Sequence, residues 1–563
     1  MTTVRGRVAT IVLPALLASG CVSPPAPRPR PGVPVPPVLV APAPTPAPVD
    51  RTATMPPAVA REFRGVWVAT VGNIDWPSRP GLSSAEQQRE LLTILDQARA
   101  LNLNAVILQV RPAADALYQS EYEPWSAVLT GEMGRAPDPL YDPLAFAVRE
   151  AHRRGLELHA WFNPFRALTA ANGSAIAANH VSRTRRDLVR RYGQHLWLDP
   201  GEPDARAHAV RVIMDVVRRY EIDGVHLDDY FYPYRERDST NRLVPFPDDA
   251  SWDRYVRSGG RLSRNDWRRS NVDVFVAALY ERIKGEKPRV KFGISPFGIW
   301  RPGNPQGVKG LDAYTELYAD ARKWLLNGWA DYFTPQIYWT VNQPARSYSS
   351  LLAWWVSQNP HGRHIWPGNF TSRVGFTTDT TWSAEEIVEQ IRATRLQDGA
   401  SGNVHFSARA LMNSHDDLVP RLAAGPYARK ALVPASPWLD SIAPARPRAA
   451  LRTDSATGDL IAELLPGDAE AVWLWVITAR ADELGGRGGG GGGGGGASWS
   501  TEIVPGWQRT HVLAAGREAL RPDEVAISAV DRTGNQGAPV TLWPKSSASI
   551  DRATRTPATG GRN

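Results

Sequence analysis

The sequence lacks the residues and motifs on which several enzyme classes depend. It contains one cysteine, Cys21, in 563 residues, so the chain cannot form an internal disulfide bond. It has no H-E-x-x-H motif, no group of cysteines and no His/Asp set at metal-ligand spacing, which argues against a metalloenzyme. It also lacks the G-x-S-x-G motif of serine hydrolases. We therefore expect neither a metal nor another cofactor.

Clustered charge and long apolar runs are also missing. The formal net charge is +8, but Lys and Arg are dispersed and no basic tract carries interleaved aromatic residues, so nucleic acid is not an expected partner. The apolar stretch at residues 8–17 is too short to span a bilayer as a stable helix. The glycine run at residues 488–496 lacks the Lys and Ser/Thr of a phosphate-binding loop and predicts a flexible insertion.

The N-terminus has the pattern of an export signal. Arg5 and Arg7 precede the apolar stretch, and small residues lead to Cys21. This end resembles a bacterial lipobox, although Ala18 stands where leucine is usual, so ordinary cleavage remains an alternative. We predict a signal peptide at 1–20 and, at 21–60, a lipidated Cys21 with a proline-rich tether. Val22 indicates an exported lipoprotein anchored in the outer membrane and facing the periplasm.

Residues 61–435 alternate between short β-rich runs and helical stretches. This order is typical of parallel strands joined by crossover helices. One helix is expected to begin at Ser84, because Ser83 and Ser84 are candidate caps ahead of Glu86. Eight β-rich runs predict a (β/α)8 TIM barrel of the α/β class. The predicted strands are 65–71, 105–110, 156–163, 224–229, 291–296, 332–338, 364–370 and 403–407, and the predicted helices include 84–101, 143–154, 203–220, 272–284 and 384–397.

The pattern changes after residue 435. Alternating runs at 471–477, 510–513 and 525–530 predict a small β-sandwich over residues 436–545, with the glycine run as a loop inside it. The sequence D-R-T-G-N at 531–535 predicts a turn. Residues 546–563 are predicted to form a disordered tail.

The most informative segment reads D-G-V-H-L-D-D-Y, from Asp223 to Tyr230. Two carboxylates at the end of an apolar strand need a chemical or solvated reason to be there, and the strand ends of a barrel carry catalytic residues. Side chains alternate along a strand, so Asp228 is expected to point into the barrel. Asp229 is expected to point toward the helices unless the strand has already turned.

Other predicted strands also end in polar or aromatic residues, which suit a polyhydroxylated substrate. Each has a structural alternative: Arg111 with Asp115 as an ion pair, and His226 as a core histidine. The 21 tryptophans supply flat apolar faces for stacking on sugars, although most are expected in the core. The candidate substrate-binding residues are Arg111, Asn163, His226, Trp300, Gln336, Tyr338 and Trp339.

Several motifs in order resemble the glycosyl-hydrolase-like family 10. They are R-G-V-W-V-A-T from Arg64, R-P-A-A-D-A-L-Y from Arg111, E-P-W-S from Glu123, L-T-G from Leu129, W-F-N-P from Trp161, D-G-V-H-L-D-D-Y-F-Y-P from Asp223 and P-Q-I-Y-W from Pro335. The resemblance covers about residues 62–411. It implies a TIM barrel, often on a bacterial lipoprotein, with a fibronectin-like C-terminal module, and one kind of member cleaves peptidoglycan glycan strands that have lost their stem peptides.

The resemblance also bears on the catalytic residues. Related amylase-like barrels use a fourth-strand aspartate, a position that Asp228 matches, and an acid glutamate on the fifth strand, where this chain has F-G-I-S-P. We expect Asp228 to stabilise or attack the anomeric carbon, with Asp115 and then Asp229 as candidates for the proton donor. The separation of the two carboxylates would decide between retention and inversion.

The predicted function is hydrolysis of a glycosidic bond in a cell-envelope polysaccharide. Peptidoglycan glycan lacking stem peptides is the preferred substrate, because a lipid-tethered enzyme reaches the wall and basic charge suits lactyl carboxylates. The alternatives are an exopolysaccharide hydrolase and, from another class, a non-catalytic glycan-binding scaffold. The expected partners are thus the polysaccharide and, through the lipid anchor, a membrane.

Overall fold

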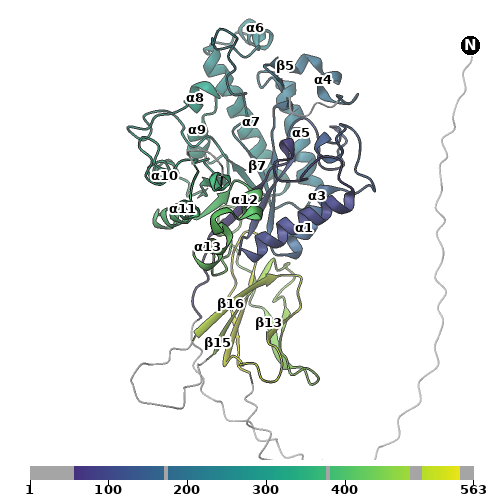
Figure 1. Cartoon of the computed structure of the whole chain (residues 1–563), viewed down its shortest axis with the longest axis vertical. Coiled ribbons are helices and arrows are strands. Elements are labelled where there is room, and N and C mark those ends of the chain that lie inside the picture. The colour runs from purple at the N-terminus through teal and green to yellow at the C-terminus, as the bar shows by residue number, and fades with distance from the viewer. Residues whose placement is uncertain (1–55, 170–174, 376–380, 482–497, 545–563) are drawn as a thin grey trace, which may run out of the picture. The chain divides into compact units, whose positions relative to one another are not determined.

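The computed structural model describes residues 56–169, 175–375, 381–481 and 498–544 (Figure 1). Parallel strands form a nine-stranded sheet in the order β10-β9-β8-β7-β3-β2-β1-β12-β11. The strands are β1 (Phe63–Val68), β2 (Ala105–Arg111), β3 (Glu157–Phe162), β7 (Gly224–Leu227), β8 (Lys291–Ile294), β9 (Tyr332–Phe333), β10 (His364–Ile365), β11 (Gly368–Asn369) and β12 (Gly402–His405).

The sheet closes on itself because β10 and β11 are two halves of one strand. Only Trp366 and Pro367 separate them, and β10 pairs with β9 while β11 pairs with β12. Hydrogen bonds continue across the gap, from Trp366 N to Phe333 O at 2.9 Å and from Val404 N to Pro367 O at 3.0 Å. Nine pieces therefore make an eight-stranded barrel, and the predicted TIM-barrel fold is confirmed.

Helices surround the barrel, and each predicted helix is present. The capping box of α1 is formed, with the Ser83 side chain accepting from Glu86 N and the Glu86 carboxylate accepting from Ser83 N. The helices are α1 (Ser84–Ala100), α2 (Ala127–Thr130), α3 (Pro143–Arg153), α4 (Val181–Thr184), α5 (Pro203–Arg219), α6 (Asp249–Arg257), α7 (Arg264–Glu286), α8 (Ala313–Glu316), α9 (Ala321–Leu326), α10 (Tyr348–Ser357), α11 (Ala384–Leu396), α12 (Ala408–Asn413) and α13 (Leu418–Ala424).

A small antiparallel sheet that was not predicted lies between β3 and β7 in the sequence. It has the order β4-β6-β5 and consists of β4 (Arg166–Leu168), β5 (Val189–Tyr192) and β6 (His195–Leu198). The runs are too short and too rich in arginine to show the alternation that identifies a strand in a sequence. This insertion contributes to the pocket described below.

The C-terminal part consists of two antiparallel sheets, which confirms the predicted sandwich. Their buried apolar side chains share one core that includes Leu464, Trp475 and Ile527. In the predicted turn, Asp531 Oδ1 accepts from Thr533 N at 2.8 Å and from Asn535 N at 2.9 Å. The sheets are β13-β14-β17 and β16-β15-β18-β19, formed by β13 (Arg448–Thr453), β14 (Leu460–Leu465), β15 (Leu474–Ala481), β16 (Ser498–Pro505), β17 (Thr510–Ala514), β18 (Glu524–Val530) and β19 (Val540–Leu542).

Some predictions fall outside the described residues. These are the signal peptide, Cys21, all but the end of the tether, the glycine run and the predicted tail. Within the described ranges, no helix combines the length and the apolar character needed to cross a membrane.

A polar layer fills the barrel interior below its carboxyl end. The Tyr332 hydroxyl lies 2.8 Å from His159 Nδ1 and 3.0 Å from His226 Nδ1. Trp67 Nε1 donates to His226 Nε2 at 3.1 Å, so Nε2 is unprotonated and the imidazole is neutral. Burial lowers the pKa of His226 well below its usual range, in agreement with that assignment.

This layer requires glycine in β8. A Cβ atom on Gly293 would lie 1.9 Å from the Tyr332 ring, while one on Gly285, in α7, would meet nothing within 4 Å. We predict that Gly293→Ala lowers the free energy of unfolding by about 1–3 kcal/mol or more. Gly285→Ala, the matched control, is expected to raise it by about 0.5–1 kcal/mol. Denaturant unfolding checks both, and a Gly293→Ala protein as stable as wild type would contradict this packing.

Candidate active site

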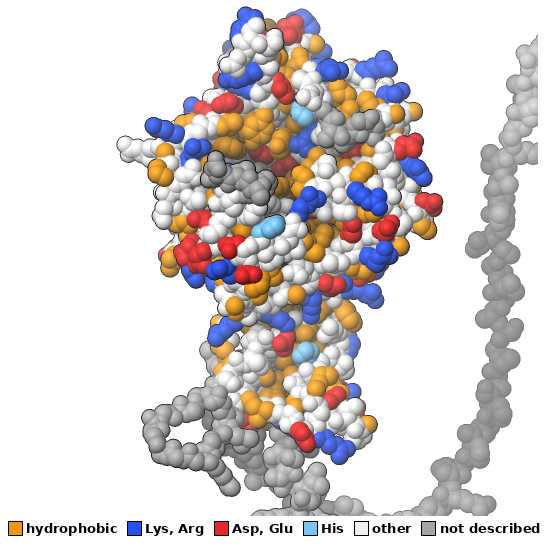
Figure 2. Space-filling model, viewed as in Figure 1, with side chains coloured by type: hydrophobic (Ala, Val, Ile, Leu, Met, Phe, Trp, Pro, Cys, Tyr) orange, Lys and Arg blue, Asp and Glu red, His pale blue; other side chains and the backbone are white. Residues whose placement is uncertain are grey.

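A pocket of about 410 Å³ opens at the carboxyl ends of the barrel strands. In Figure 2, a hollow in the barrel face is bordered by hydrophobic side chains, with acidic side chains visible inside it. Such a volume is typical of a small-molecule site. The pocket is lined by Trp67, Ala69, Val71, Ile74, Gln109, Trp161, Arg166, Thr169, His195, Trp197, Asp228, Asp229, Tyr230, Pro233, Tyr234, Glu236, Ser295, Gln336, Tyr338 and Phe406.

Asp228 and Asp229 both line this pocket. Strand β7 ends at Leu227, so the alternation of a regular strand no longer governs either side chain. Because the chain has already turned at this point, Asp229 reaches the pocket rather than the helices. The two residues are only 4% and 2% exposed, so their charges depend on the protein for stabilisation.

Fixed N–H groups hold Asp228. Its Oδ2 accepts from Trp161 Nε1 at 3.1 Å and from Asn163 Nδ2, and its Oδ1 accepts from Tyr230 N at 3.1 Å. Each of these groups is an N–H donor, so none of them could accept a hydrogen bond from a protonated Asp228. The arrangement therefore favours the ionised form of Asp228.

A relay of side-chain amides sets the direction of the Asn163 hydrogen bond. Gln109 Oε1 accepts from the backbone N–H groups of Thr70, at 2.9 Å, and Val71, at 2.8 Å. Its Nε2 must then donate to Asn163 Oδ1, at 2.6 Å, which turns Asn163 Nδ2 toward Asp228. The loop after β1 thus determines which atom of Asn163 faces the carboxylate.

Asp229 has a different set of partners. Gln336 Nε2 donates to its Oδ1 at 3.1 Å and also to Ser295 O at 2.9 Å, and the Tyr234 hydroxyl contacts Oδ2. A hydroxyl can donate to a carboxylate or accept from a carboxylic acid. Asp229 can therefore hold a proton without losing this hydrogen bond.

The two carboxyl groups titrate as a pair. Burial raises the pKa of Asp228 to about 6; the charge of Arg166 opposes the shift and the charge of Asp229 adds to it. Burial is also the main cause that raises the pKa of Asp229, opposed by its hydrogen bonds from Tyr234 and Gln336 and by Arg166. Two neighbouring acids with raised pKa values suit proton transfer near neutral pH.

The sequence did not single out the cationic side chain of this pocket. Arg166 comes from β4, stacks 4.3 Å from the Tyr230 ring and donates to Pro112 O at 3.2 Å. The same insertion supplies His195 and Trp197 to the lining. The only available signal was the position of Arg166, three residues after Asn163 at the end of a predicted strand.

Arg111 and Asp115 do not line the pocket. Arg111 is fully buried and forms an ion pair with Glu123 at 2.6 Å, whose second partner is His208 at 2.8 Å. Asp115 is also fully buried, accepts from Ala113 N at 3.1 Å, and burial raises its pKa to about 6. The structure thus places the first candidate for the proton donor away from Asp228, and pairs Arg111 with Glu123 rather than with Asp115.

The other predicted substrate-binding residues divide into three groups. Gln336 and Tyr338 line the pocket. Asn163 and His226 lie behind it, bonded to Asp228 and in the layer with Tyr332. Two tryptophans lie elsewhere: Trp300 bonds Asp320 and stacks on Trp354, and Trp339 packs against Phe297.

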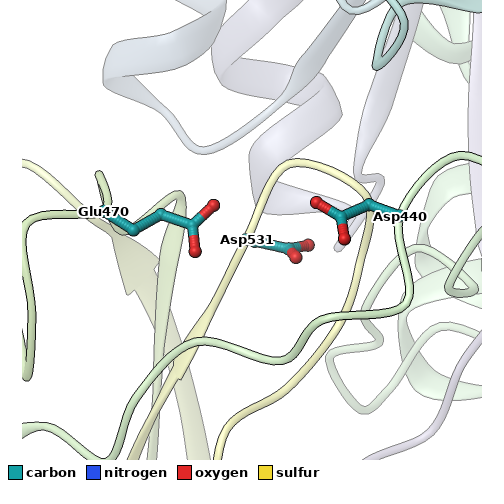
Figure 3. A group of neighbouring side chains, drawn as sticks. All are labelled: Asp440, Glu470 and Asp531. Carbon is teal, nitrogen blue, oxygen red and sulfur yellow. The ribbon is translucent and has the colours of Figure 1, made fainter.

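One acidic group among the described residues has a geometry open to a metal ion. Oxygen atoms of Asp440, Glu470 and Asp531 lie within 4.8 Å of one another (Figure 3). Arg289 already pairs with Asp440 at 2.8 Å and with Glu470 at 2.9 Å, and Asp531 caps its own turn. Arg289 thus offsets part of the negative charge of this group, and the group is separate from the pocket lining.

Comparison with known proteins identifies the family. Glycosyl hydrolase YngK of Bacillus subtilis is 41% identical over 409 residues, which cover 71% of this chain and 79% of that protein. Glycosyl hydrolase DigH of Escherichia coli K12 is 37% identical over 325 residues, covering 54% of this chain and 72% of that protein. Among solved structures, the glycoside hydrolase domain of PgaB (BpsB) from Bordetella bronchiseptica aligns at 15% identity, covering 65% of this chain and 99% of that domain with a TM-score of 0.44. Residues 62–384 match the family described as glycosyl hydrolase-like 10, and the chain belongs to that family.

Proposed function

We propose that this protein hydrolyses glycosidic bonds in the glycan strands of peptidoglycan, with strands that lack stem peptides as its substrate. The observation that carries the proposal is the pair of buried carboxyl groups, Asp228 and Asp229, in an aromatic-walled pocket at the carboxyl end of a barrel. Hydrolysis of a glycoside needs one group to protonate the leaving oxygen and another to stabilise positive charge at the anomeric carbon. This pocket offers both.

The hydrogen bonds suggest which carboxyl group has which role. Both oxygens of Asp228 already accept N–H groups, so Asp228 is the anion that stabilises the anomeric carbon. Asp229 faces a hydroxyl that tolerates either protonation state, so it is the proton donor. After the bond breaks, the Asp229 carboxylate accepts a proton from the attacking water.

Recognition of the sugar rests on stacking and hydrogen bonds more than on charge. Among the described residues, Asp228, Asp229 and Glu236 supply three carboxyl groups to the pocket lining, while Arg166 supplies one guanidinium. The pocket lining is therefore acidic although the net charge of the chain is +8. The positive charge of the chain attracts an anionic polymer only at a distance from the pocket. The lactyl carboxylates of the strand would lie outside the deepest part of the pocket.

The preference for a wall substrate comes from the N-terminal sequence. A lipid on Cys21 and a proline-rich tether would hold the barrel at the outer membrane, facing the periplasm, within reach of peptidoglycan. Peptide-free strands are an open, unbranched chain that can lie across the pocket.

Mutation of the two acids tests the assignment. We predict that Asp229→Asn lowers kcat on peptide-free strands by about 10²- to 10⁴-fold. Asp228→Asn is predicted to lower it by about 10²- to 10³-fold. Strands are prepared from sacculi with an amidase, and the soluble oligosaccharides released are measured by chromatography. Asp96→Asn, on a side chain that is 63% exposed, is the matched control and should keep full activity.

Two results would count against this assignment. Binding of strands by the wild type and by Asp228→Asn, without release of oligosaccharides by either, would make the protein a glycan-binding scaffold. A loss of activity in Asp115→Asn as large as in Asp229→Asn would return the role of proton donor to Asp115.

The raised pKa of the pair predicts an acidic optimum. The proton donor Asp229 must be protonated, so the rate should fall as pH rises through the pKa of Asp229, which burial raises above its usual range. Rates of strand cleavage measured from pH 4 to 9 check this. A rate that stays constant to pH 9 would show that neither carboxyl group donates the proton.

Removal of the Arg166 charge should shift that pH dependence. The Arg166 guanidinium lowers the pKa of both Asp228 and Asp229. In Arg166→Met the pKa of the pair should rise, so the protonated form persists and the decline in rate moves to higher pH. The readout is the midpoint of the decline, which does not depend on the absolute rate. An unchanged midpoint, or one at lower pH, would contradict the electrostatic role of Arg166.

A further inference from the structure

We infer that the pocket cleaves 1,2-trans glycosides of 2-acetamido sugars, and that the acetamido carbonyl oxygen of the substrate, rather than a protein carboxylate, attacks the anomeric carbon. This inference rests on the proposed function, because it names the nucleophile and the sugar class of the same site. It also makes the acetamido N–H group of the substrate the group that Asp228 stabilises.

Both acids of the pocket come from a single strand end. Asp228 and Asp229 are consecutive residues after one strand, β7. The neighbouring strands β8 and β9 contribute the neutral side chains of Ser295 and Gln336 to the lining. In the usual two-carboxylate mechanisms the acids flank the scissile bond, one on each side. The side chains of consecutive residues are poorly placed to lie on opposite sides of the scissile bond, but both can contact the same side of a sugar ring.

Among the described residues, the pocket lining contains one further carboxylate, which lies against a different wall. Glu236 follows β7 in a loop whose backbone bonds Tyr192 Oη at 3.0 Å and Val244 N at 2.9 Å. Its side chain occupies the space that a Cβ atom on Gly193 would need, 2.6 Å from Oε1, in the turn between β5 and β6. Glu236 therefore belongs to the wall built by the insertion, and it is the alternative nucleophile that the test must address.

The hydrogen bonds of Asp228 make it poorly suited to attack the anomeric carbon. A carboxylate that accepts three N–H groups has its lone pairs stabilised, which makes it a weak nucleophile. Oδ1 accepts one N–H group, from Tyr230, and keeps room for another. This free acceptor position suits the N–H group of a substrate acetamide. The Asp228 carboxylate would then stabilise the positive charge that the acetamido group acquires during the reaction.

The hydroxyl group of Tyr338 is a further candidate contact for the substrate. Tyr338 lines the pocket beside the two acids, and none of the residues that the structure describes forms a hydrogen bond with its hydroxyl. Burial and the charges of Asp229, Tyr230 and Asp228 raise the pKa of Tyr338 well above its usual range, so the hydroxyl remains a donor. An acetamide carbonyl oxygen would satisfy it and would be held in place for attack.

Apolar surface for the acetamido methyl group is also present. Trp67 and Phe406 lie edge to face at 6.1 Å, and Phe406 is 6.1 Å from the Tyr338 ring. Trp161 adds its ring beside Asp228, to which its Nε1 donates. All four aromatic side chains line the pocket.

The reaction then proceeds in two balanced steps. The acetamido oxygen forms a bond to the anomeric carbon while the bond to the leaving oxygen breaks, and the proton of Asp229 passes to that oxygen. Asp228 stabilises the positive charge on the resulting oxazolinium ring. Asp229, now a carboxylate, takes a proton from water as the water oxygen attacks the anomeric carbon and the ring opens. The product keeps the original anomeric configuration.

The test alters the acetamido group of the substrate. One batch of peptide-free strands is N-deacetylated and divided into portions that are left as amines, re-acetylated or trifluoroacetylated. Wild-type protein is expected to cleave re-acetylated strands normally, to cleave trifluoroacetylated strands about 10²-fold more slowly, and to leave the amines uncut, because a weakened intramolecular nucleophile loses most of its rate advantage. Binding of the catalytically impaired Asp229→Asn protein to the acetylated and trifluoroacetylated portions should be similar.

Matched variants give a second readout. Tyr338→Phe should lower kcat on re-acetylated strands by about 10- to 10²-fold with little change in KM, since it removes one donor to the reacting oxygen. Tyr122→Phe, on a tyrosine that is 37% exposed and outside the pocket lining, should leave both constants unchanged.

Failure of the acetamido mechanism can be distinguished from failure of the proposed function. Equal cleavage of trifluoroacetylated and re-acetylated strands, inversion of configuration, or loss of all activity in Glu236→Gln would overturn the acetamido mechanism while the proposed function stands. If the wild type released nothing from re-acetylated or native strands, the proposed function itself would fail and this inference with it.

Discussion

Two consecutive carboxyl groups are buried at the end of one barrel strand, and much of the surrounding structure serves to keep them there. A buried anion without hydrogen-bond donors is costly, so Asp228 and Asp229 require fixed partners. The relay from the backbone of Thr70 through Gln109 to Asn163 provides one such partner and sets its direction. It ties the ends of β1, β2, β3 and β7 to one carboxylate.

The remaining strands support the same pair from the other side. Gln336, after β9, joins Asp229 to the backbone of Ser295, after β8. Below them, His226 and Tyr332 form a neutral polar layer that fills the barrel. The insertion between β3 and β7 adds Arg166, whose charge moderates the pKa of both acids. The pair is thus neither freely ionised nor fixed as neutral acids, which suits a site that must give and take a proton.

Most of the fold could be predicted from the sequence. Strands buried on both faces read as apolar runs, and helix signals such as Ser83 with Glu86 are local, so the eight strands and the major helices were found. The closed barrel followed from the count of eight strands, but the break at Trp366 and Pro367, inside the predicted strand 364–370, was not predicted. The insertion was missed because its three strands are short and rich in arginine, and so was Arg166.

The site was harder to predict because side-chain partners lie far apart in the chain. Asp228 and its position at the mouth of the barrel followed from the strand pattern. The place of Asp229 depended on where β7 ends, a matter of one residue that periodicity does not fix. Asp115 follows a strand end as well, yet the chain around it folds inward and pairs Arg111 with Glu123, a contact that spacing did not reveal.

We propose above all that Asp229 protonates the glycosidic oxygen of a bound 2-acetamido sugar, while Asp228 accepts a hydrogen bond from the acetamido N–H group of the same sugar. A crystal structure of the Asp229→Asn protein with a peptide-free glycan tetrasaccharide tests it most directly. The account predicts that the glycosidic oxygen lies within hydrogen-bonding distance of residue 229, with the acetamido N–H on Asp228 and its carbonyl oxygen between Tyr338 and the anomeric carbon. A tetrasaccharide bound with its glycosidic oxygens beyond the reach of both residues, or bound outside this pocket, would contradict it.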